Sequence, residues 1–241
     1  MRNGACCRLD FSLWHGGTED GKTRITGGCG LHGTRSTQST IMKADVAIIG
    51  AGVIGAAIAR EMARYDLAVV LLEREVEPAF GTSKANSGVV HAGFHSAPGT
   101  LEASLCVEGN AMFDEIAAEL SVPFRRNGCL MVAMSPEEVD VLREHLDRGR
   151  RNGVPGLRLL DAGEARALEP GLAPEVVGAL HAPTGGIVCP YQLTFALVEN
   201  AVANGVRFMA GSPVTSLHVR EGRIAAVETA EAIIETTWVV N

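Results

Sequence analysis

The chain has 241 residues, a formal net charge of −7, 46% hydrophobic residues and 28 glycines. This composition is ordinary for a Gly-rich α/β protein and argues against a chain that is disordered throughout. The negative charge argues against a nucleic-acid partner, because phosphates are repelled unless a protein offers a concentrated basic face. The longest nearly uncharged apolar run, residues 46–59, is too short to span a bilayer, so we expect no transmembrane segment.

The first 41 residues differ from all that follow. Gly, Ser, Thr, Arg and Cys dominate them, and no hydrophobic period is sustained. We therefore expect residues 1–41 to be a disordered extension. Because Met42 directly precedes the first expected strand, we expect the biological start of the protein at Met42.

The six cysteines show no C-x-x-C spacing and no density typical of a secreted scaffold. They are Cys6, Cys7, Cys29, Cys106, Cys129 and Cys189. This pattern predicts free thiols in a cytoplasmic protein, and no metal site of the zinc or iron–sulfur kind.

The clearest functional pattern begins at Val46–Ile49, an apolar run typical of a strand buried on both faces of a parallel sheet. Gly50, Gly52 and Gly55 follow in the spacing G-x-G-x-x-G. The first glycine permits a tight turn, the second lets the backbone approach a pyrophosphate, and the third allows close helix–strand packing. The pattern predicts a site for a dinucleotide cofactor.

A helix is expected over Ala56–Tyr65, after the glycine turn, with its N-terminal N–H groups facing the phosphates. A second apolar strand, Ala68–Leu72, ends in Glu73. A carboxylate about 20 residues after the glycines is placed to accept hydrogen bonds from ribose hydroxyls. An acid here disfavours a 2′-phosphate and so disfavours NADP, whereas NAD and FAD both remain open.

The segment Gly81–Phe94, GTSKANSGVVHAGF, is a loop of small polar residues that leads into apolar ones. It resembles a second cofactor-contacting element. Pro98, Gly99 and Thr100 then open a helix, which is expected to place one apolar stripe in the core. The stripe consists of Leu101, Leu105, Met112, Phe113, Ile116 and Leu120.

The next part of the chain predicts short strands and helices in alternation. The expected elements are a strand at Cys129–Met134, a helix capped by Ser135 and running towards Arg151, a short helix capped by Asp161 and Glu164, and strands at Val176–Ala182 and Gly186–Val188.

The last part returns to the pattern of the beginning. It predicts a helix from Pro190 to about Asn204, a third parallel strand at Val206–Ala210, an antiparallel meander of Val214–Val219, Arg223–Glu228 and Ala232–Glu235, and a buried strand at Thr237–Asn241.

Taken with the motifs, this order resembles the FAD-dependent oxidoreductase superfamily that includes D-amino-acid oxidase, and within it the anaerobic-type glycerol-3-phosphate dehydrogenases. The resemblance covers about Lys43 to Asn241. Besides the glycine fingerprint it rests on GTSKANSGVVHAGF, on PGTLEASLCVEGN (98–110) and on PTGGIVCPYQLTFALVENAVANGV (183–206). The block at 98–110 also looks like the L-2-hydroxyglutarate dehydrogenases, a sister group.

The resemblance implies an α/β fold in which a Rossmann-like FAD-binding domain, a parallel sheet with a β-meander, is interrupted by part of an α+β substrate domain. Residues 42–97 and 189–241 would form the FAD-binding domain, and residues 98–188 the partial substrate domain. Members of the superfamily continue past this point. The resemblance therefore implies that the chain is C-terminally truncated within the cofactor domain.

The resemblance also implies which residues hold FAD. The ADP half would be held by Gly50, Gly52, Gly55 and Glu73, with Arg74 beside the adenine. The polar loop would lie along the pyrophosphate and flavin through Thr82, Ser83, Asn86, Ser87 and Gly88. Val214 matches a position whose backbone contacts adenine.

The implied reaction is hydride transfer from a carbinol or amine carbon of a small-molecule substrate to the flavin, after which electrons pass to an unidentified acceptor. His91 and His95 are the titratable candidates for removing the hydroxyl proton. In the glycerol-3-phosphate dehydrogenases of the respiratory type, the segment HGG after the polar loop is followed by an arginine that helps to bind phosphate. In this chain the corresponding segment is HAGFH, and His95 stands at the position of that arginine. Arg125 or Arg126 could supply a contact to an anionic substrate instead.

Three hypotheses remain open from the sequence. The first is a dehydrogenase of glycerol 3-phosphate or a similar small hydroxylated anion, or the N-terminal portion of one. The second is a 2-hydroxy-acid dehydrogenase of the L-2-hydroxyglutarate type. The third is a non-catalytic nucleotide-binding fragment that needs a partner chain or a missing C-terminal region.

Overall fold

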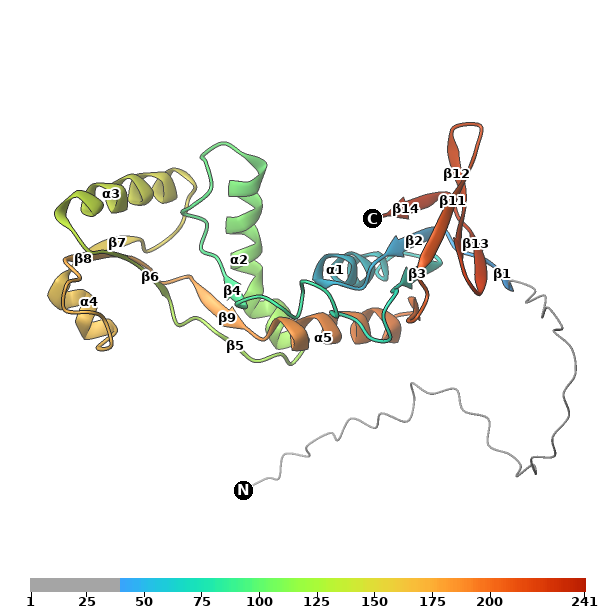
Figure 1. The fold of residues 1–241 in the computed structure, drawn as a ribbon, viewed down its shortest axis with the longest axis horizontal. Helices are drawn as coiled ribbons and strands as arrows, with labels where there is room; N and C mark the ends of the chain where they lie inside the picture. Colours follow the sequence, from blue (N-terminus) through green and yellow to red (C-terminus); the bar gives the residue numbers. More distant parts are fainter. Residues whose placement is uncertain (1–39) are drawn as a thin grey trace, which may run out of the picture. The chain divides into compact units, whose positions relative to one another are not determined.

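The computed structural model describes residues 40–241 (Figure 1). The expected disordered extension therefore lies outside the described residues up to position 39. Its last two residues, Thr40 and Ile41, belong to strand β1 (Thr40–Lys43), which pairs in parallel with β13 (Ala232–Glu235). Strand β1 thus begins two residues before the expected boundary at Met42.

A four-stranded parallel sheet, in the order β10-β3-β2-β14, joins the two ends of the described chain. Its strands are β2 (Val46–Ile49), β3 (Val69–Leu72), β10 (Arg207–Met209) and β14 (Trp238–Val240). All four residues of β3 are buried, because a parallel sheet is covered on both faces. The expected parallel strands are confirmed.

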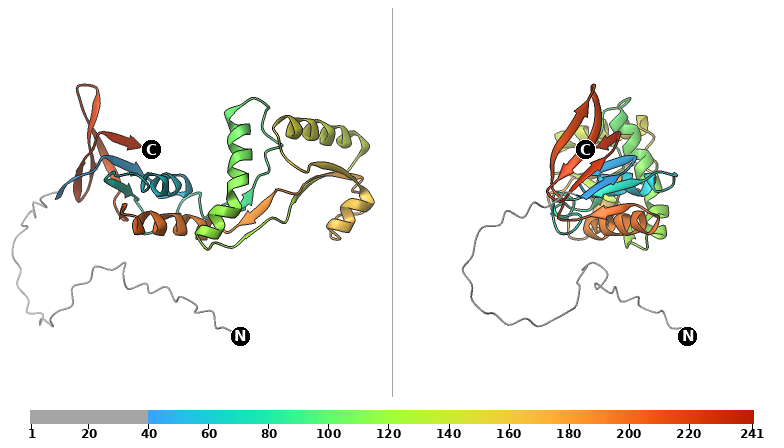
Figure 2. Two further views of the ribbon diagram at one scale, coloured as in Figure 1. Left: turned by 180° about the vertical axis from the view of Figure 1, so that it is seen from behind. Right: turned by 90° about the vertical axis from the view of Figure 1, so that its right-hand side faces the viewer.

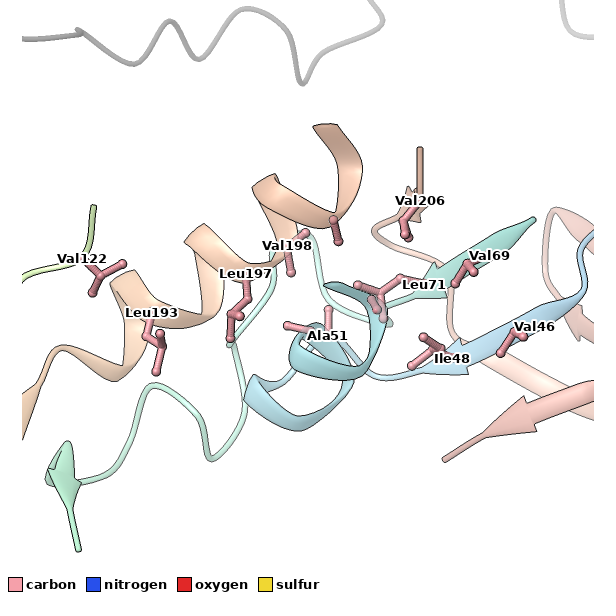
Figure 3. Packing of buried hydrophobic residues seen from close by; sticks show 13 residues of the cluster. Val46, Ile48, Ala51, Val69, Leu71, Val122, Leu193, Leu197, Val198 and Val206 are labelled. Carbon is pink, nitrogen blue, oxygen red and sulfur yellow. The ribbon is translucent and has the colours of Figure 1, made fainter. Parts of the chain in front are cut away.

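Alternate residues of the sheet pack into two different cores. Ile48 and Leu71 face helices α1 (Val53–Met62) and α5 (Pro190–Ala203), where Leu197 packs against them (Figure 3). Since successive side chains of a strand point to opposite faces, their neighbours in β2 and β3 pack on the other side. Those neighbours are Ala47, Val70 and Leu72, which contact Val227 and Ile234.

The second core lies against an antiparallel meander, as expected. Strands β11 (Val214–Arg220), β12 (Arg223–Thr229) and β13, which are among the orange-red strands of Figure 2, run in sequence. They form a sheet with β1 in the order β1-β13-β12-β11. Glu221 and Gly222 make the tight turn of the hairpin, and both have positive φ, 52° and 75°. Positive φ at both positions is what a two-residue hairpin turn with the correct twist requires.

The middle of the chain forms two small antiparallel sheets and three helices, in agreement with the expected α+β part. The sheets have the orders β4-β9-β5 and β6-β8-β7. The elements are β4 (Val89–Val90), α2 (Leu101–Glu119), β5 (Phe124–Arg125), β6 (Cys129–Ala133), α3 (Pro136–Arg151), β7 (Arg158–Asp161), α4 (Ala162–Leu168), β8 (Gly178–Ala182) and β9 (Gly186–Val188). Strands β5 and β7 were not predicted, because they are short and carry charged residues.

The expected helix starts are confirmed at side-chain level. Thr100 accepts a hydrogen bond from the backbone of Ala103, and Ser135 accepts one from Glu138. Asp161 and Glu164 form a complete capping box at the start of α4. Helix α1 ends at Met62, earlier than the expected Tyr65.

The prediction that one stripe of α2 is core is wrong for its first half. Leu101, Leu105 and Met112 are 72%, 56% and 54% exposed. The other members, Phe113, Ile116 and Leu120, pack against the core beneath α1 and α5. Periodicity alone could not separate the two groups, because the first half of α2 packs through Ala103 and Val107 instead of through Leu101 and Leu105.

Two glycines inside helices offer a matched test of packing. At Gly149 of α3 an added Cβ would lie 2.3 Å from Leu157 Cδ1 and 2.8 Å from Phe94 Cβ, whereas at Gly109 of α2 it would meet nothing within 4 Å. Gly149→Ala should therefore lower the free energy of unfolding by about 1–3 kcal/mol through overpacking. Gly109→Ala should raise it by about 0.5–1 kcal/mol, because alanine favours helix. Urea denaturation of both variants checks the opposite signs, and equal effects would contradict this packing.

Candidate functional site

The carboxyl ends of β2 and β3 open into a cleft of about 310 Å³. Ligands of open α/β sheets bind outside the carboxyl ends of the strands, so this is the expected place for a cofactor. Most of the residues that the sequence proposed for FAD line the cleft: Gly50, Gly52, Glu73, Arg74, Thr82, Ser83 and Val214. The fingerprint, the polar loop and the start of the meander therefore meet at one site.

Gly50 and Gly55 of the turn are required for different reasons. Gly50 has φ +97°, a left-handed conformation that favours glycine. A Cβ on Gly55 would lie 2.0 Å from the carbonyl oxygen of Gly50, so only glycine lets helix α1 approach the turn this closely. Gly55 thus allows the close packing of helix α1 against the turn but does not itself line the cleft.

Ser83 joins the polar loop to the first turn of α1. Gly52, the N-cap residue, has no side chain to cap the helix, and Ser83 Oγ instead accepts a hydrogen bond of 2.9 Å from Val53 N. A Cβ on Gly52 would lie 3.1 Å from the same oxygen. The first N–H groups of a helix have no intrahelical acceptor and attract anions, so a hydroxyl and a helix N-terminus together suit a phosphate.

The buried carboxylate of Glu73 holds the glycine turn against the end of β3. Its Oε2 accepts a hydrogen bond of 2.7 Å from Ala51 N, and its Oε1 accepts one of 3.0 Å from Glu75 N. Each carboxylate oxygen has two lone pairs, so the group retains acceptors for ribose hydroxyls that enter the cleft. The glycine cradle, the capped helix end and Glu73 all fit the ADP half of a dinucleotide.

The segment after β10 closes the other side of the cleft. Ser212 N donates to Glu73 O and Gly211 N donates to Glu75 O, both at 2.7 Å. These bonds bring Ser212 and Pro213 to the lining, together with Phe80 from the far side. No sequence pattern pointed to these three residues. Backbone pairing between distant segments places Ser212 and Pro213.

Three predicted residues of the polar loop do not line the cleft. The Asn86 side chain is used inside the loop, where it donates to Thr82 O and Ser83 O and accepts from Gly88 N. A Cβ on Gly88 would lie 2.2 Å from Val188 O, so this glycine permits a close backbone approach. Ser87 is exposed.

The two histidine candidates lie in a loop that follows β4, and neither lines the cleft. The ring of His95 lies 4.0 Å from Phe94, 5.4 Å from His145 and 6.1 Å from His91, measured between centroids. Partial burial lowers the pKa of His95, and the charges of His145, His91 and Arg148 lower it further. A neutral imidazole is the form that can accept a proton.

The proposed anion contact through Arg126 conflicts with the structure. Its guanidinium donates to Asp114, to Asn110 and to the carbonyl oxygen of Thr184. With these donors used inside the protein, Arg126 is a structural residue, and of the two suggested arginines only the exposed Arg125 remains a candidate.

The sequence predicted that all six cysteines are free thiols, and three of the six lie among the described residues. Cys106, Cys129 and Cys189 are free, as expected, whereas Cys6, Cys7 and Cys29 lie before residue 40. Between residues 40 and 241 no cluster of three or more His, Cys, Asp or Glu side chains is arranged to hold a metal ion. In the same range no helix has both the length and the apolar character needed to cross a membrane.

The lowered pKa of His95 makes a prediction about stability. Protonation of His95 is harder in the folded than in the unfolded chain, so stability should fall as pH drops below the ordinary pKa of 6.5. His95→Gln should therefore lose less stability than the wild type between about pH 7.5 and 5.5. Urea unfolding of both proteins at the two pH values measures this, and an identical loss in both would disprove it.

Comparison with known sequences identifies the family. The family described as FAD dependent oxidoreductase (DAO) matches residues 45–241. A glycerol 3-phosphate dehydrogenase of Caloramator mitchellensis is 43% identical over 197 residues, covering 82% of this chain and 41% of that protein. The mitochondrial L-2-hydroxyglutarate dehydrogenase of Caenorhabditis elegans is 37% identical over 190 residues, covering 78% and 43%. The chain thus spans less than half the length of these curated relatives.

Solved structures share the fold. The L-α-glycerophosphate oxidase of Mycoplasma pneumoniae, solved with FAD bound, superposes with a TM-score of 0.75 at 28% identity, covering 82% of this chain and 53% of that one. L-Proline dehydrogenase from P. horikoshii gives a TM-score of 0.77 at 24% identity, covering 83% and 52%, and shows the fold alone. These matches confirm the α/β fold and FAD, rather than NAD, as the cofactor of the family. The chain belongs to the DAO family of FAD-dependent oxidoreductases.

Proposed function

We propose that this chain forms the ADP-binding part of an FAD-dependent dehydrogenase that oxidises glycerol 3-phosphate or a similar small hydroxylated anion. The observation that carries the proposal is the cleft at the carboxyl ends of β2 and β3, where the glycine turn, Ser83 and Glu73 converge. The substrate follows from the Caloramator mitchellensis relative, a glycerol 3-phosphate dehydrogenase at 43% identity.

In this proposal the cleft holds the ADP half of FAD. Gly50, Gly52 and Ser83 would face the pyrophosphate at the N-terminus of α1, and Glu73 would accept hydrogen bonds from the ribose. Arg74 and Val214 line the same cleft and would contact the adenine, whereas Thr82 would lie along the pyrophosphate with Ser83. Gly55 would act through the shape of the turn. Asn86, Ser87 and Gly88 are proposed to continue towards the flavin.

When bound, FAD supplies the acceptor for a hydride from the substrate carbon. The protein must then take up the hydroxyl proton, and His91 or His95 is proposed as its acceptor. The lowered pKa of His95 favours the neutral imidazole, the form that can accept a proton, and at the same time makes it a weaker base. The electrons are proposed to pass on to a separate acceptor, which these residues do not identify.

A 2-hydroxy acid is the second candidate substrate. It is supported by the Caenorhabditis elegans relative, an L-2-hydroxyglutarate dehydrogenase at 37% identity. Because Arg126 is used inside the protein, it supports neither a phosphate nor a carboxylate subsite. Arg125 could bind either group, so it does not distinguish the two substrates. Position 95, a histidine where the respiratory enzymes carry an arginine, also leaves both substrates open.

The third candidate is a nucleotide-binding fragment that needs further polypeptide, either a partner chain or a C-terminal region. Its support is that the chain spans 41% of the length of its Caloramator mitchellensis relative and that Leu101, Leu105 and Met112 of α2 are exposed. Exposed apolar side chains in a row are typical of a face that another polypeptide covers.

A cytoplasmic location is proposed from the free thiols.

Cofactor binding can be tested in the chain itself through Glu73. Glu73→Gln replaces one of the two carboxylate oxygens by an NH₂ group, which cannot accept from Ala51 N or Glu75 N, so one of these two bonds is lost. The substitution should therefore loosen the glycine turn and weaken FAD binding about tenfold. Glu61→Gln is the matched control, because Glu61 lies on the surface of α1 and pairs with Arg64. Quenching of flavin fluorescence measures both affinities. Equal affinity in the two variants would refute the role of Glu73, and no binding by the wild type would refute the cleft.

Substrate identity can be tested by mixing the FAD-loaded protein with each substrate in the absence of oxygen. Glycerol 3-phosphate should bleach the visible absorbance of the flavin, whereas L-2-hydroxyglutarate should not, because the proposed site takes a phosphate ester. The reverse result selects the 2-hydroxy-acid reaction. Bound flavin that neither compound bleaches, but that dithionite does, would leave the fragment hypothesis standing and reject both enzymes for this chain.

A further inference from the structure

The loop from His91 to Ser96 has little regular structure, and side chains from two helices take up its backbone carbonyl groups. Asn110 of α2 donates to His91 O, Asn152 at the end of α3 donates to Gly93 O and Ser96 O, and Arg148 donates to His95 O. Buried carbonyl groups need such partners, because a loop has no ladder to satisfy them. Both proton-acceptor candidates are thus attached to α2 and α3 through their backbone.

The backbone contact at His91 is better defined than the contacts that hold the His95 segment. Asn110 is only 6% exposed, and its Nδ2 donates at 2.9 Å both to His91 O and to Thr184 O. Its Oδ1 accepts a bond of 2.9 Å from Arg126. Both donors and the acceptor of the amide are therefore used, and the bonds fix the side chain in one orientation.

Arg126 holds Asn110 in that orientation. One terminal nitrogen of the guanidinium contacts Asn110 Oδ1 and Thr184 O, the other contacts Asn110 O at 2.7 Å, and Nε contacts Asp114 at 2.6 Å. Arg126 therefore contacts both the side chain and the backbone of Asn110. Three segments meet at this network: helix α2, the residue after β5, and the turn between β8 and β9.

We propose that Asn110, oriented by Arg126, is a positioning residue for His91. Strand β4 consists of only Val89 and Val90, and its pairing with β9 ends at Val90, so the strand ladder does not extend to His91. The imidazole of His91 is exposed, so its position depends on where its backbone is anchored. Asn110 supplies that anchor from the middle of a 19-residue helix. The catalytic consequence rests on the proposed function, in which His91 receives the substrate proton, whereas the positioning itself does not.

The test uses Asn110→Asp, which has nearly the same shape. A carboxylate can still pair with Arg126, but it offers no donor and places an oxygen against the carbonyl groups of His91 and Thr184. In the 241-residue chain with labelled histidines, nuclear magnetic resonance should show a shifted His91 ring signal and a weaker magnetisation transfer between His91 and His95. Thermal unfolding should show that the chain still folds.

Asn152→Asp is the matched control on the same loop. It removes the donors to Gly93 and Ser96, so it should move the signals of His95 more than those of His91. Glu108→Gln, which changes an exposed side chain of α2 two positions before Asn110, should leave both histidines unchanged. If Asn110→Asp does not fold, Arg126→Gln takes its place, since it leaves Asn110 in place but removes the guanidinium that orients it.

A purely structural role would lower the unfolding temperature and leave the magnetisation transfer between His91 and His95 as in the wild type, and this result would overturn the proposal. In FAD-loaded protein that bleaches with substrate, Asn110→Asp should lower the rate of bleaching about tenfold with less than a twofold change in the half-saturating substrate concentration. Shifted His91 signals with an unchanged rate would overturn the catalytic consequence and keep the positioning. Absence of any bleaching in the wild type would count against the proposed function alone.

Discussion

The candidate site depends on one carboxylate that joins two adjacent strand ends. Glu73 directly follows β3 and is buried. Its two carboxylate oxygens accept hydrogen bonds from the N–H groups of Ala51 in the glycine turn and of Glu75 two residues on. A buried carboxylate is tolerated only when such hydrogen bonds compensate the loss of water. The same bonds that make Glu73 tolerable therefore define the shape of the cleft, and its remaining lone pairs are left for a ligand.

Outside the regular strands and helices, short polar side chains supply the hydrogen bonds that the backbone groups need. Ser83 caps α1 from a distant loop, Asn86 closes the polar loop on itself, and Asn110 and Asn152 satisfy the carbonyl groups of the histidine loop. Each has one or two donors and an acceptor on a stiff, short stem, so it can fix irregular backbone without long-range packing. Such residues connect the α/β part to the loops that carry its candidate chemistry.

The errors of sequence interpretation have a common cause. The α2 stripe has helical spacing throughout, yet Leu105 is exposed and Ile116 is packed, because burial depends on which neighbour lies opposite. Arg126 looked like a surface arginine available to an anion, yet Asp114 and Asn110 occupy it. Strand β7 carries charges at both ends and is visible only through its pairing with β8. In each case a partner distant in sequence decides the outcome.

The sequence by itself determined the glycine turn, the buried parallel strands, the helix caps, the hairpin at Glu221-Gly222 and the family, since residue spacing, hydrophobic pattern and turn chemistry are local properties. Only the tertiary structure showed that Ser83 caps α1, that Ser212 and Phe80 reach the cleft, and that Asn110 holds His91. These contacts join residues far apart along the chain. Their geometry is fixed by the packing of whole elements, and no local pattern encodes it.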